Sequence, residues 1–231
     1  MAATALGILG GTFDPIHRGH VELARDLRAT LPLSAVRFIP VGAPPHRAAP
    51  IASAADRLAM IELALAEHPG LAVDAREIER PGPSYTVLTL EELRREDPAR
   101  PLALIVGADA FLGLPAWHRW RELFDLAHLV VVARPGVDLD LARAPALLPE
   151  WERRRTGDAK ALVATPAGAI LTHPVTAHDI SATALRALLA RGLAGYDAAR
   201  GLLPAAVLAY IERNQLYRTP PCPSERSRES P

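Results

Sequence analysis

Short, continuously apolar runs, each followed by a segment of helical character, constrain this chain more than any other feature of its sequence. Residues 5–9, 102–106 and 129–133 contain no polar side chain, which is typical of strands buried on both faces. Strands of this kind that alternate with helices form a parallel sheet with helices on both sides. We therefore expect an α/β fold: a doubly wound parallel sheet with a small helical part near the C-terminus.

Further elements follow from the same patterns and from residues that begin or end helices. Additional strands are expected at residues 35–40, 71–78 and 169–172. Ser53 can cap a helix, Gly192 can end one and Pro204 can begin one. The expected helices cover residues 21–29, 53 to about 67, 84 to about 95, 180–190 and 204 to about 213.

The length and composition suit one folded unit. A chain of 231 residues, of which 49% are hydrophobic, can bury a substantial core. We expect a single domain over residues 1–218. Within it, residues 137–160 carry Pro, Arg and Glu without a clean period and are predicted to form a partly helical surface insertion. Residues 219–231 are rich in proline and polar residues and are predicted to be disordered.

Charge, hydropathy and cysteine content argue against several classes of protein. The charges of the 26 basic and 26 acidic residues cancel, so the chain lacks the excess of positive charge that is typical of a protein with a nucleic-acid partner. No apolar stretch approaches the length of a bilayer span, and the N-terminal residues lack a signal-peptide pattern. Cys222 is the single cysteine and cannot form an internal disulfide. We expect a cytoplasmic protein without a membrane partner, and the sequence leaves its oligomeric state open.

Residues 10–20, which read Gly-Gly-Thr-Phe-Asp-Pro-Ile-His-Arg-Gly-His, lie between the first predicted strand and the first predicted helix. A glycine pair at such a junction lets backbone N–H groups approach a bound anion. The helix that follows directs its positive end at the same place. His17 and His20 add side-chain donors. The segment therefore predicts a polyphosphate site, and the histidines suggest chemistry on the phosphates.

The two histidines have other possible roles. Imidazoles three residues apart can chelate a metal, but no cysteine or acidic cluster accompanies His17 and His20, so we expect no metal ligands here. Either ring can also cap or pack at the start of a helix. Two histidines that flank a glycine after a Gly-Gly-Thr turn favour donation to phosphate oxygens instead, with stabilisation of charge as phosphorus is attacked.

A second cluster is formed by Ser181, Thr183 and Arg186. Arg186 lies one helical turn after Thr183, so that the guanidinium and the hydroxyl can face the same way. A helix start with an arginine can hold the outer phosphates of a nucleotide. Ser181 alone is equally well explained as the cap of its helix.

Several other candidates follow predicted strands or lie in loops. Ligands of parallel sheets bind beyond the carboxyl ends of the strands, where Asp109 and Arg134 fall. Asp109 can bind ribose hydroxyls or cap a helix. Trp117, after Pro115, can stack on an aromatic ligand or cover the core. Arg47 follows a stiff Pro-Pro pair and can bring a cation to an anionic substrate, or belong to an exposed loop.

These motifs together resemble the bacterial nicotinate-nucleotide adenylyltransferases of the HxGH nucleotidyltransferase superfamily. The resemblance covers roughly residues 5–217. The glycine–histidine segment marks only the superfamily, whereas the Ser-Tyr-Thr element, the loop tryptophan and the Arg-Pro-Gly element narrow it to the family. The segments that carry it are residues 10–20, 44–47, 83–86, 105–109, 133–136 and 180–186.

The resemblance implies a Rossmann-like fold and a transfer of the adenylyl group of ATP to nicotinate mononucleotide, which yields deamido-NAD and pyrophosphate. It implies Mg²⁺ bound mainly through ATP phosphates and water, with no metal-ligating residue. The implied catalytic residues are His17, His20 and Arg186. The implied ATP-binding residues are Gly10, Gly11, Thr12, Phe13, His17, His20, Ser181, Thr183 and Arg186. The implied mononucleotide-binding residues are Arg47, Thr86, Asp109, Trp117, His118 and Arg134.

One residue departs from the family pattern, and other functions remain to be weighed. Position 118 is often aromatic in the family and is His118 here, which bears on nicotinate binding if ring packing there matters. The alternatives are a related adenylyl- or cytidylyltransferase with another phosphorylated acceptor, such as phosphopantetheine, and a non-catalytic ATP-binding regulator. An NAD-dependent oxidoreductase is disfavoured because Gly7, Gly10 and Gly11 do not give the Gly-x-Gly-x-x-Gly spacing.

Overall fold

One parallel sheet forms the centre of the molecule. The computed structural model describes residues 4–44, 49–133, 139–175 and 180–218. Within these ranges seven strands pair in the order β3-β2-β1-β4-β5-β7-β6, and every neighbouring pair is parallel, which confirms the predicted sheet. The strands are β1 (Ala5–Gly11), β2 (Leu33–Pro40), β3 (Leu71–Val73), β4 (Leu102–Gly107), β5 (His128–Ala133), β6 (Arg155–Thr156) and β7 (Ile170–Pro174).

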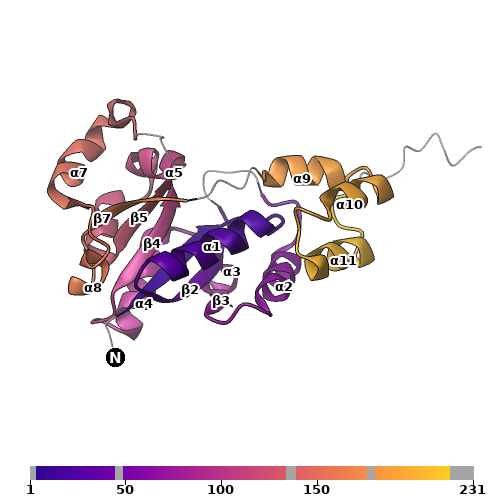
Figure 1. Ribbon diagram of the computed structural model, residues 1–231, viewed down its shortest axis with the longest axis horizontal. Coiled ribbons are helices and arrows are strands. Elements are labelled where there is room, and N and C mark those ends of the chain that lie inside the picture. Colours follow the sequence, from indigo (N-terminus) through magenta and orange to yellow (C-terminus); the bar gives the residue numbers. More distant parts are fainter. Residues whose placement is uncertain (1–3, 45–48, 134–138, 176–179, 219–231) are drawn as a thin grey trace, which may run out of the picture.

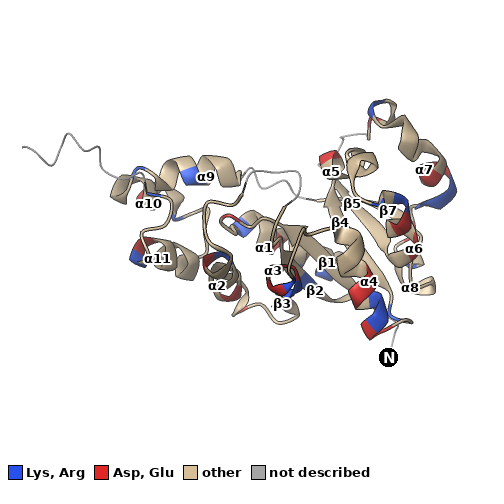
Figure 2. Ribbon diagram, turned by 180° about the vertical axis from the view of Figure 1, so that it is seen from behind, with Lys and Arg blue, Asp and Glu red and all other residues tan. Residues whose placement is uncertain are grey.

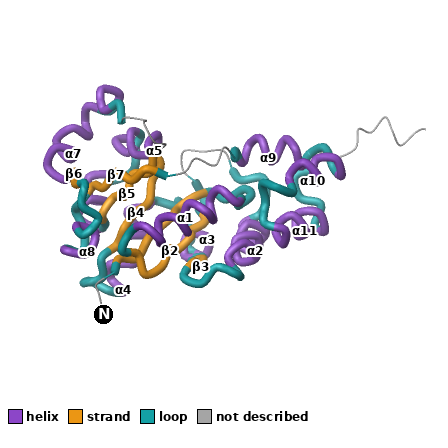
Figure 3. The backbone as a smooth tube through the Cα atoms, viewed as in Figure 1, coloured by secondary structure: helices purple, strands orange, loops and turns teal. Residues whose placement is uncertain are grey.

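Helices lie on both faces of this sheet (Figures 1 and 3). The α-helices of the described residues are α1 (Arg18–Thr30), α2 (Ala54–Leu65), α3 (Arg76–Glu79), α4 (Thr86–Glu96), α5 (Ala108–Leu112), α6 (Leu123–Leu126), α7 (Leu148–Arg154), α8 (Ala161–Ala164), α9 (Ala182–Leu189), α10 (Leu193–Ala199) and α11 (Ala205–Arg213). Short 3₁₀ turns are η1 (Leu114–Ala116), η2 (Trp120–Glu122), η3 (Leu141–Arg143) and η4 (Pro145–Leu147).

Two apolar cores form because successive strand residues point to opposite faces of the sheet. In β1, Leu9 belongs to the core shared with α1, α2 and α9–α11, whereas Leu6 and Ile8 belong to the core shared with α4–α6. In β4, Ile105 and Leu104 divide in the same way. The doubly wound arrangement is thus confirmed. The predicted C-terminal helical part is the group α9–α11, which lies beside α2 at one end of the molecule (Figure 1).

Local signals placed several helix ends correctly. The Ser53 hydroxyl caps α2 by accepting the Asp56 N–H at 3.1 Å. Pro204 directly precedes α11. Gly192 follows the end of α9 with φ +69°, a left-handed conformation that glycine adopts without strain. The helices at these three positions are therefore confirmed.

The prediction of a strand over residues 71–78 is confirmed for residues 71–73 and wrong for the rest. β3 ends at Val73, and α3 begins at Arg76. The cause is Asp74, whose Oδ1 accepts the Arg76 N–H at 3.2 Å. An aspartate that bonds to the backbone two residues on turns the chain and ends the strand.

The segment expected to be a surface insertion contributes to the sheet and to a core. Its described part, residues 139–160, is partly helical as expected, but it also supplies the edge strand β6, which pairs with β7. Leu147 is fully buried in the core under α4–α6. Helix α10, after Gly192, was not predicted, because its sequence has no cap or strong period to mark it. The tail of residues 219–231 lies outside the described residues.

Surface character agrees with the balanced composition. Both acidic and basic residues occur on α3, α4 and α7 (Figure 2). Among the residues that the structure describes, no helix combines the length and apolarity needed to cross a bilayer.

Leu147→Ala should destabilise the protein by about 2–5 kcal/mol, because it deletes a buried side chain and leaves a cavity. The neighbouring Leu148 is 37% exposed, and Leu148→Ala should change the free energy of unfolding by about 0.5 kcal/mol or less. Urea unfolding of the two variants measures both effects. Equal small losses would show that residues 139–156 are a surface insertion after all.

Candidate active site

The strand order places a reversal at the carboxyl ends of β1 and β4. The chain passes from β1 to β2 on one side, and β4 lies on the other side of β1. Open parallel sheets bind ligands at such a point. A cavity of about 300 Å³ opens here, between the ends of these strands, α3, the start of α4 and the turn after η1.

Six of the predicted site residues line this cavity. They are Gly10, Gly11 and Thr12 of the glycine loop, together with Thr86, Trp117 and His118. A Cβ atom added to Gly10 would meet no atom within 4 Å, so the loop backbone faces open space there. Residues expected for ATP and residues expected for the mononucleotide thus share one cavity, although they are up to 108 positions apart in the chain.

The start of α4 forms one wall. Ser84, two residues before α4, is buried, and its Oγ accepts the N–H groups of Gly42 and Ala43 at 3.0 and 3.2 Å. This ties the loop after β2 to the start of α4 and fixes Thr86 at the first helical position. The Leu88 N–H donates to the Tyr85 carbonyl at 3.0 Å, and α4 has no side-chain cap. The N–H groups of Thr86 and Val87 have no acceptor within the helix and are the ones that can serve an anion in the cavity.

Trp117 and His118 form the adjoining wall. The Trp117 N–H donates to the Leu114 carbonyl and closes η1. The His118 ring packs on the Tyr85 ring, with centroids 4.3 Å apart and planes at 30°. His118 thus packs on the residue that precedes α4 and also lines the cavity.

The histidine pair lies at the start of α1. His17 is the N-cap residue, and its ring stacks on that of His20 with centroids 3.7 Å apart. Burial, followed by the charge of His17, lowers the pKa of His20 from 6.5 to about 3. The His17 backbone N–H donates to His20 Nδ1 at 3.3 Å. A neutral His20 with Nδ1 as acceptor carries its proton on Nε2, which makes Nε2 a donor.

Buried groups hold the glycine loop in place. Phe13 adopts φ +48°, a strained conformation for a residue with a side chain. Arg57 of α2 is 1% exposed and donates to the carbonyls of Thr12 and Val41, both at 2.8 Å. The Asp14 carboxylate, 3% exposed, accepts the N–H groups that precede α2. These contacts fix the loops after β1 and β2 relative to each other.

Helix α9 brings the second predicted cluster to the same loop. Arg186 donates to the Asp14 carbonyl at 2.7 Å and to Thr183 Oγ1 at 3.2 Å. The predicted common orientation of Thr183 and Arg186 is therefore seen. Ser181 is the N-cap residue of α9, and its Oγ lies 3.5 Å from the Ala184 N–H. This geometry fits the capping role that the sequence left open.

Of the remaining residues predicted to bind the mononucleotide, one lies outside the cavity lining and two lie outside the described residues. Asp109 is exposed, in the first turn of α5 just beyond β4, and is absent from the lining residues. Arg47 and Arg134 lie outside the described residues.

Sequence reasoning missed two residues at the site, Arg57 and Glu77. Arg57 lies on the buried face of α2 with Met60, Ile61 and Ala64, and a charge on an apolar face is a signal that it has buried partners. Glu77 lines the cavity and accepts a hydrogen bond from Thr89 at 2.7 Å. Burial raises the pKa of Glu77.

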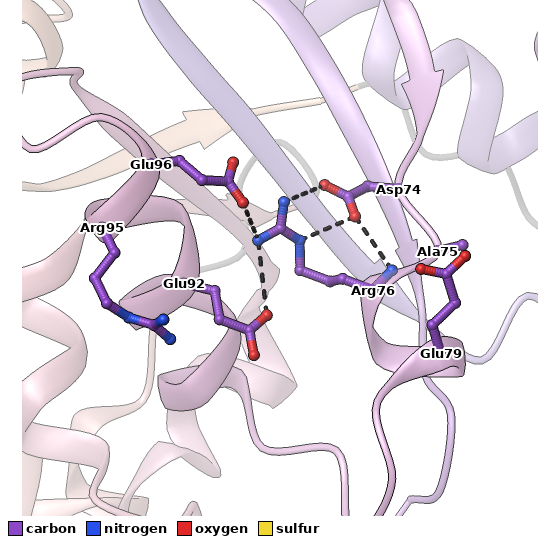
Figure 4. Close-up of a pocket in the computed structure, with 7 residues that line it drawn as sticks. All are labelled: Asp74, Ala75, Arg76, Glu79, Glu92, Arg95 and Glu96. Atoms are coloured by element: carbon purple, nitrogen blue, oxygen red, sulfur yellow. Dashed lines mark hydrogen bonds and ion pairs between the residues drawn. The ribbon is translucent and has the colours of Figure 1, made fainter.

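Glu77 gave no sequence signal because α3 is a single turn whose position depends on distant ion pairs. Arg76 of α3 binds Asp74 at 2.8 Å and Glu96 of α4 at 2.9 Å (Figure 4). These side chains line a second hollow, of about 550 Å³. Its charged groups are largely paired with one another and lie away from the glycine loop, so we assign this hollow the structural role of holding α3 against α4.

The comparisons with known proteins agree with this geometry. Residues 8–188 match the cytidylyltransferase-like family. A protein of Dechloromonas aromatica named "Probable nicotinate-nucleotide adenylyltransferase" is 50% identical over 215 residues, which are 92% of this chain and 97% of that protein. One of Acidithiobacillus ferrooxidans with the same name is 49% identical over 216 residues, 93% of this chain and 96% of the relative. The chain belongs to the nicotinate-nucleotide adenylyltransferase family.

A solved structure of distant sequence shares the fold of this adenylyltransferase family member. The Plasmodium falciparum nicotinic acid mononucleotide adenylyltransferase complexed with NaAD superposes with a TM-score of 0.69 at 14% identity. The match covers 93% of this chain and 97% of the other. The Rossmann-like architecture of the sheet is thereby confirmed.

Low pH should destabilise this adenylyltransferase through His20. Its folded pKa of about 3 lies below the unfolded value of 6.5, so the unfolded state binds the extra proton between these values. The stabilisation is present above about pH 6.5 and is lost as the pH falls. Between about pH 7.5 and about pH 5, wild type should lose about 1–2 kcal/mol more than His20→Asn.

Urea unfolding of both proteins at the two pH values measures this difference. His68→Asn, in the turn before the edge strand β3, controls for the loss of an imidazole away from the site. If His20→Asn loses as much as wild type, His20 is not held neutral by the fold.

Proposed function

We propose that this chain binds ATP over the glycine loop and nicotinate mononucleotide in the adjoining cavity, and transfers the adenylyl group between them. The products are deamido-NAD and pyrophosphate. The observation that carries the proposal is the shared cavity at the strand-order reversal, lined by residues 10–12 on one side and by Thr86 and Trp117 on the other. Its volume of about 300 Å³ suits part of a small ligand such as a pyridine ring and its ribose.

The chemistry requires no general base. A phosphate oxygen of the mononucleotide is already an anion; it attacks the α-phosphorus of ATP in line, a new P–O bond forms, and the bond to the bridging oxygen of pyrophosphate breaks. Catalysis is then positioning and stabilisation of charge. We assign His17, the donor Nε2 of His20 and Arg186 to the phosphates, because all three surround the loop at residues 10–14.

Mg²⁺ fits this site through the substrate. Among the described residues there is no group of three or more His, Cys, Asp or Glu that could hold a metal. We propose ATP phosphates and water as its ligands, which are the usual partners of Mg²⁺ in nucleotide sites. The ion would neutralise phosphate charge there, while the residues named above orient the phosphates.

Measuring pyrophosphate release from ATP with a panel of acceptors tests the proposal. Nicotinate mononucleotide should be the preferred acceptor, and phosphopantetheine and phosphorylated alcohols should be poor ones. Release with one of these instead would identify a related nucleotidyltransferase. Binding of ATP without release in the presence of any acceptor would indicate a regulator.

His17→Ala should lower turnover by roughly 10²–10³ and change ATP binding much less, because the lost donor acts mainly on charge that develops in the transition state. His17 is also the N-cap of α1, so His17→Asn is the matched variant that keeps a capping side chain. Turnover at saturating substrates should fall in both variants, while thermal melts should show His17→Asn closer to wild type. A fully active His17→Asn would reduce His17 to a helix cap.

The acid acceptor should be preferred over nicotinamide mononucleotide by roughly ten- to a hundredfold, about 1.5–3 kcal/mol. The N–H donors at the start of α4 match a carboxylate, which only accepts, whereas a carboxamide presents a donor. Ratios of kcat/KM for the two nucleotides measure this preference. His118→Ala removes a ring but keeps the backbone N–H and should retain the preference. Equal rates with both nucleotides would contradict the pocket assignment.

A further inference from the structure

The C-terminal turn brings Tyr217 back to the glycine loop. After α11 ends at Arg213, Gln215 and Tyr217 adopt φ of +53° and +64°, and the chain reverses. The Leu216 N–H then donates to the Ile211 carbonyl at 3.0 Å. In this position the Tyr217 hydroxyl donates to Asp14 Oδ1 at 2.6 Å, across 203 residues of sequence.

Asp14 is the point at which three distant segments meet. Its Oδ2 accepts the Ile51 N–H at 2.8 Å and its Oδ1 the Ala52 N–H at 3.1 Å, both from the chain before α2. Its carbonyl accepts Arg186 of α9 at 2.7 Å. Tyr217 adds the C-terminal segment. A carboxylate with 3% exposure depends on such donors, because water reaches it poorly.

The Tyr217 hydroxyl acts as a hydrogen-bond donor to this carboxylate. Burial and the hydrogen bond to Asp14 raise the pKa of the phenol above its usual value, so that it stays protonated. Tyr217 is not among the residues that line the cavity. Its contact is with Asp14, so any effect on substrate passes through the loop.

We propose that Tyr217 is a positioning residue of the ATP site, which holds Asp14 and through it the glycine loop and Arg186. The inference rests on the placement of ATP over residues 10–14 under the proposed function. Loss of the hydroxyl leaves Asp14 Oδ1 with one donor instead of two. The Asp14 carbonyl that orients Arg186 is then less firmly fixed, and so are the phosphate contacts of Arg186.

Tyr217→Phe removes this single hydroxyl, and Tyr210→Phe is its matched control. Tyr210 also lies in the C-terminal segment and donates to an aspartate of α2, Asp56 Oδ1, at 3.0 Å, but that contact does not touch the glycine loop. Tyr217→Phe should weaken ATP binding, measured by titration calorimetry without acceptor, by about tenfold. Tyr210→Phe should bind ATP within about twofold of wild type.

Steady-state kinetics separate positioning from stability. At a temperature well below both melting points, Tyr217→Phe should raise the KM for ATP and leave the KM for nicotinate mononucleotide within about twofold, since the cavity wall at α4 is untouched. If both variants lose thermal stability but bind ATP like wild type, Tyr217 is only structural and the proposal is overturned. If wild type binds ATP but releases no pyrophosphate with any acceptor, the proposed function fails while the calorimetric comparison still tests Tyr217.

A double-mutant cycle tests whether the effect passes through Asp14. Asp14→Ala, which removes the acceptor, Tyr217→Phe and the double variant are compared by ATP binding. If Tyr217 acts through the carboxylate, adding Tyr217→Phe to Asp14→Ala should cost less than about twofold. Fully additive losses would overturn the proposed route. Should Asp14→Ala fail to fold, the comparison of Tyr217→Phe with Tyr210→Phe decides alone.

Discussion

The geometry of the site depends on the hydrogen bonds of the buried Arg57 guanidinium. A charge with 1% exposure needs hydrogen-bond acceptors, and here they are the carbonyls of Thr12 and Val41, in the loops that leave β1 and β2. Burial lowers the pKa of Arg57, while the Asp14 carboxylate favours the charged form. Because one planar group bonds to both loops, their spacing is set by guanidinium geometry. The width of the site at this edge of the sheet follows from that spacing.

The glycine loop makes contacts toward both faces of the sheet. Toward α4 it lines the cavity with Thr86 and Trp117, and toward α1 and α9 it meets His20 and Arg186. Strand-order reversal makes this possible, because helices on opposite faces of the sheet both begin next to the end of β1. In-line transfer places the attacking oxygen and the departing pyrophosphate on opposite sides of the α-phosphorus. The loop faces the cavity on one side and His20 and Arg186 on the other.

The sequence was informative where the determinants are local. Apolar runs located the inner strands, and Ser53 and Pro204 marked helix starts, because caps and burial on both faces act within a few residues. One local signal was misread: the turn at Asp74 ends β3 early. The other misses depend on distant contacts. Residues 155–156 join the sheet edge through β7, and Glu77 reaches the cavity on a helix held by the ion pair of Arg76 with Glu96.

The protonation state of the histidine pair depends on contacts that the sequence motif does not show. Spacing alone placed His17 and His20 at one helix start, but not their protonation. Burial, followed by the charge of the stacked His17, lowers the pKa of His20, and the bond from the His17 N–H to His20 Nδ1 leaves the proton of the neutral ring on Nε2. A neutral donor stabilises oxygens as their charge grows without binding the resting phosphates as tightly as a cation would. Under the proposed function, the backbone bond of the N-cap residue therefore leaves His20 suited to the transition state more than to bound ATP.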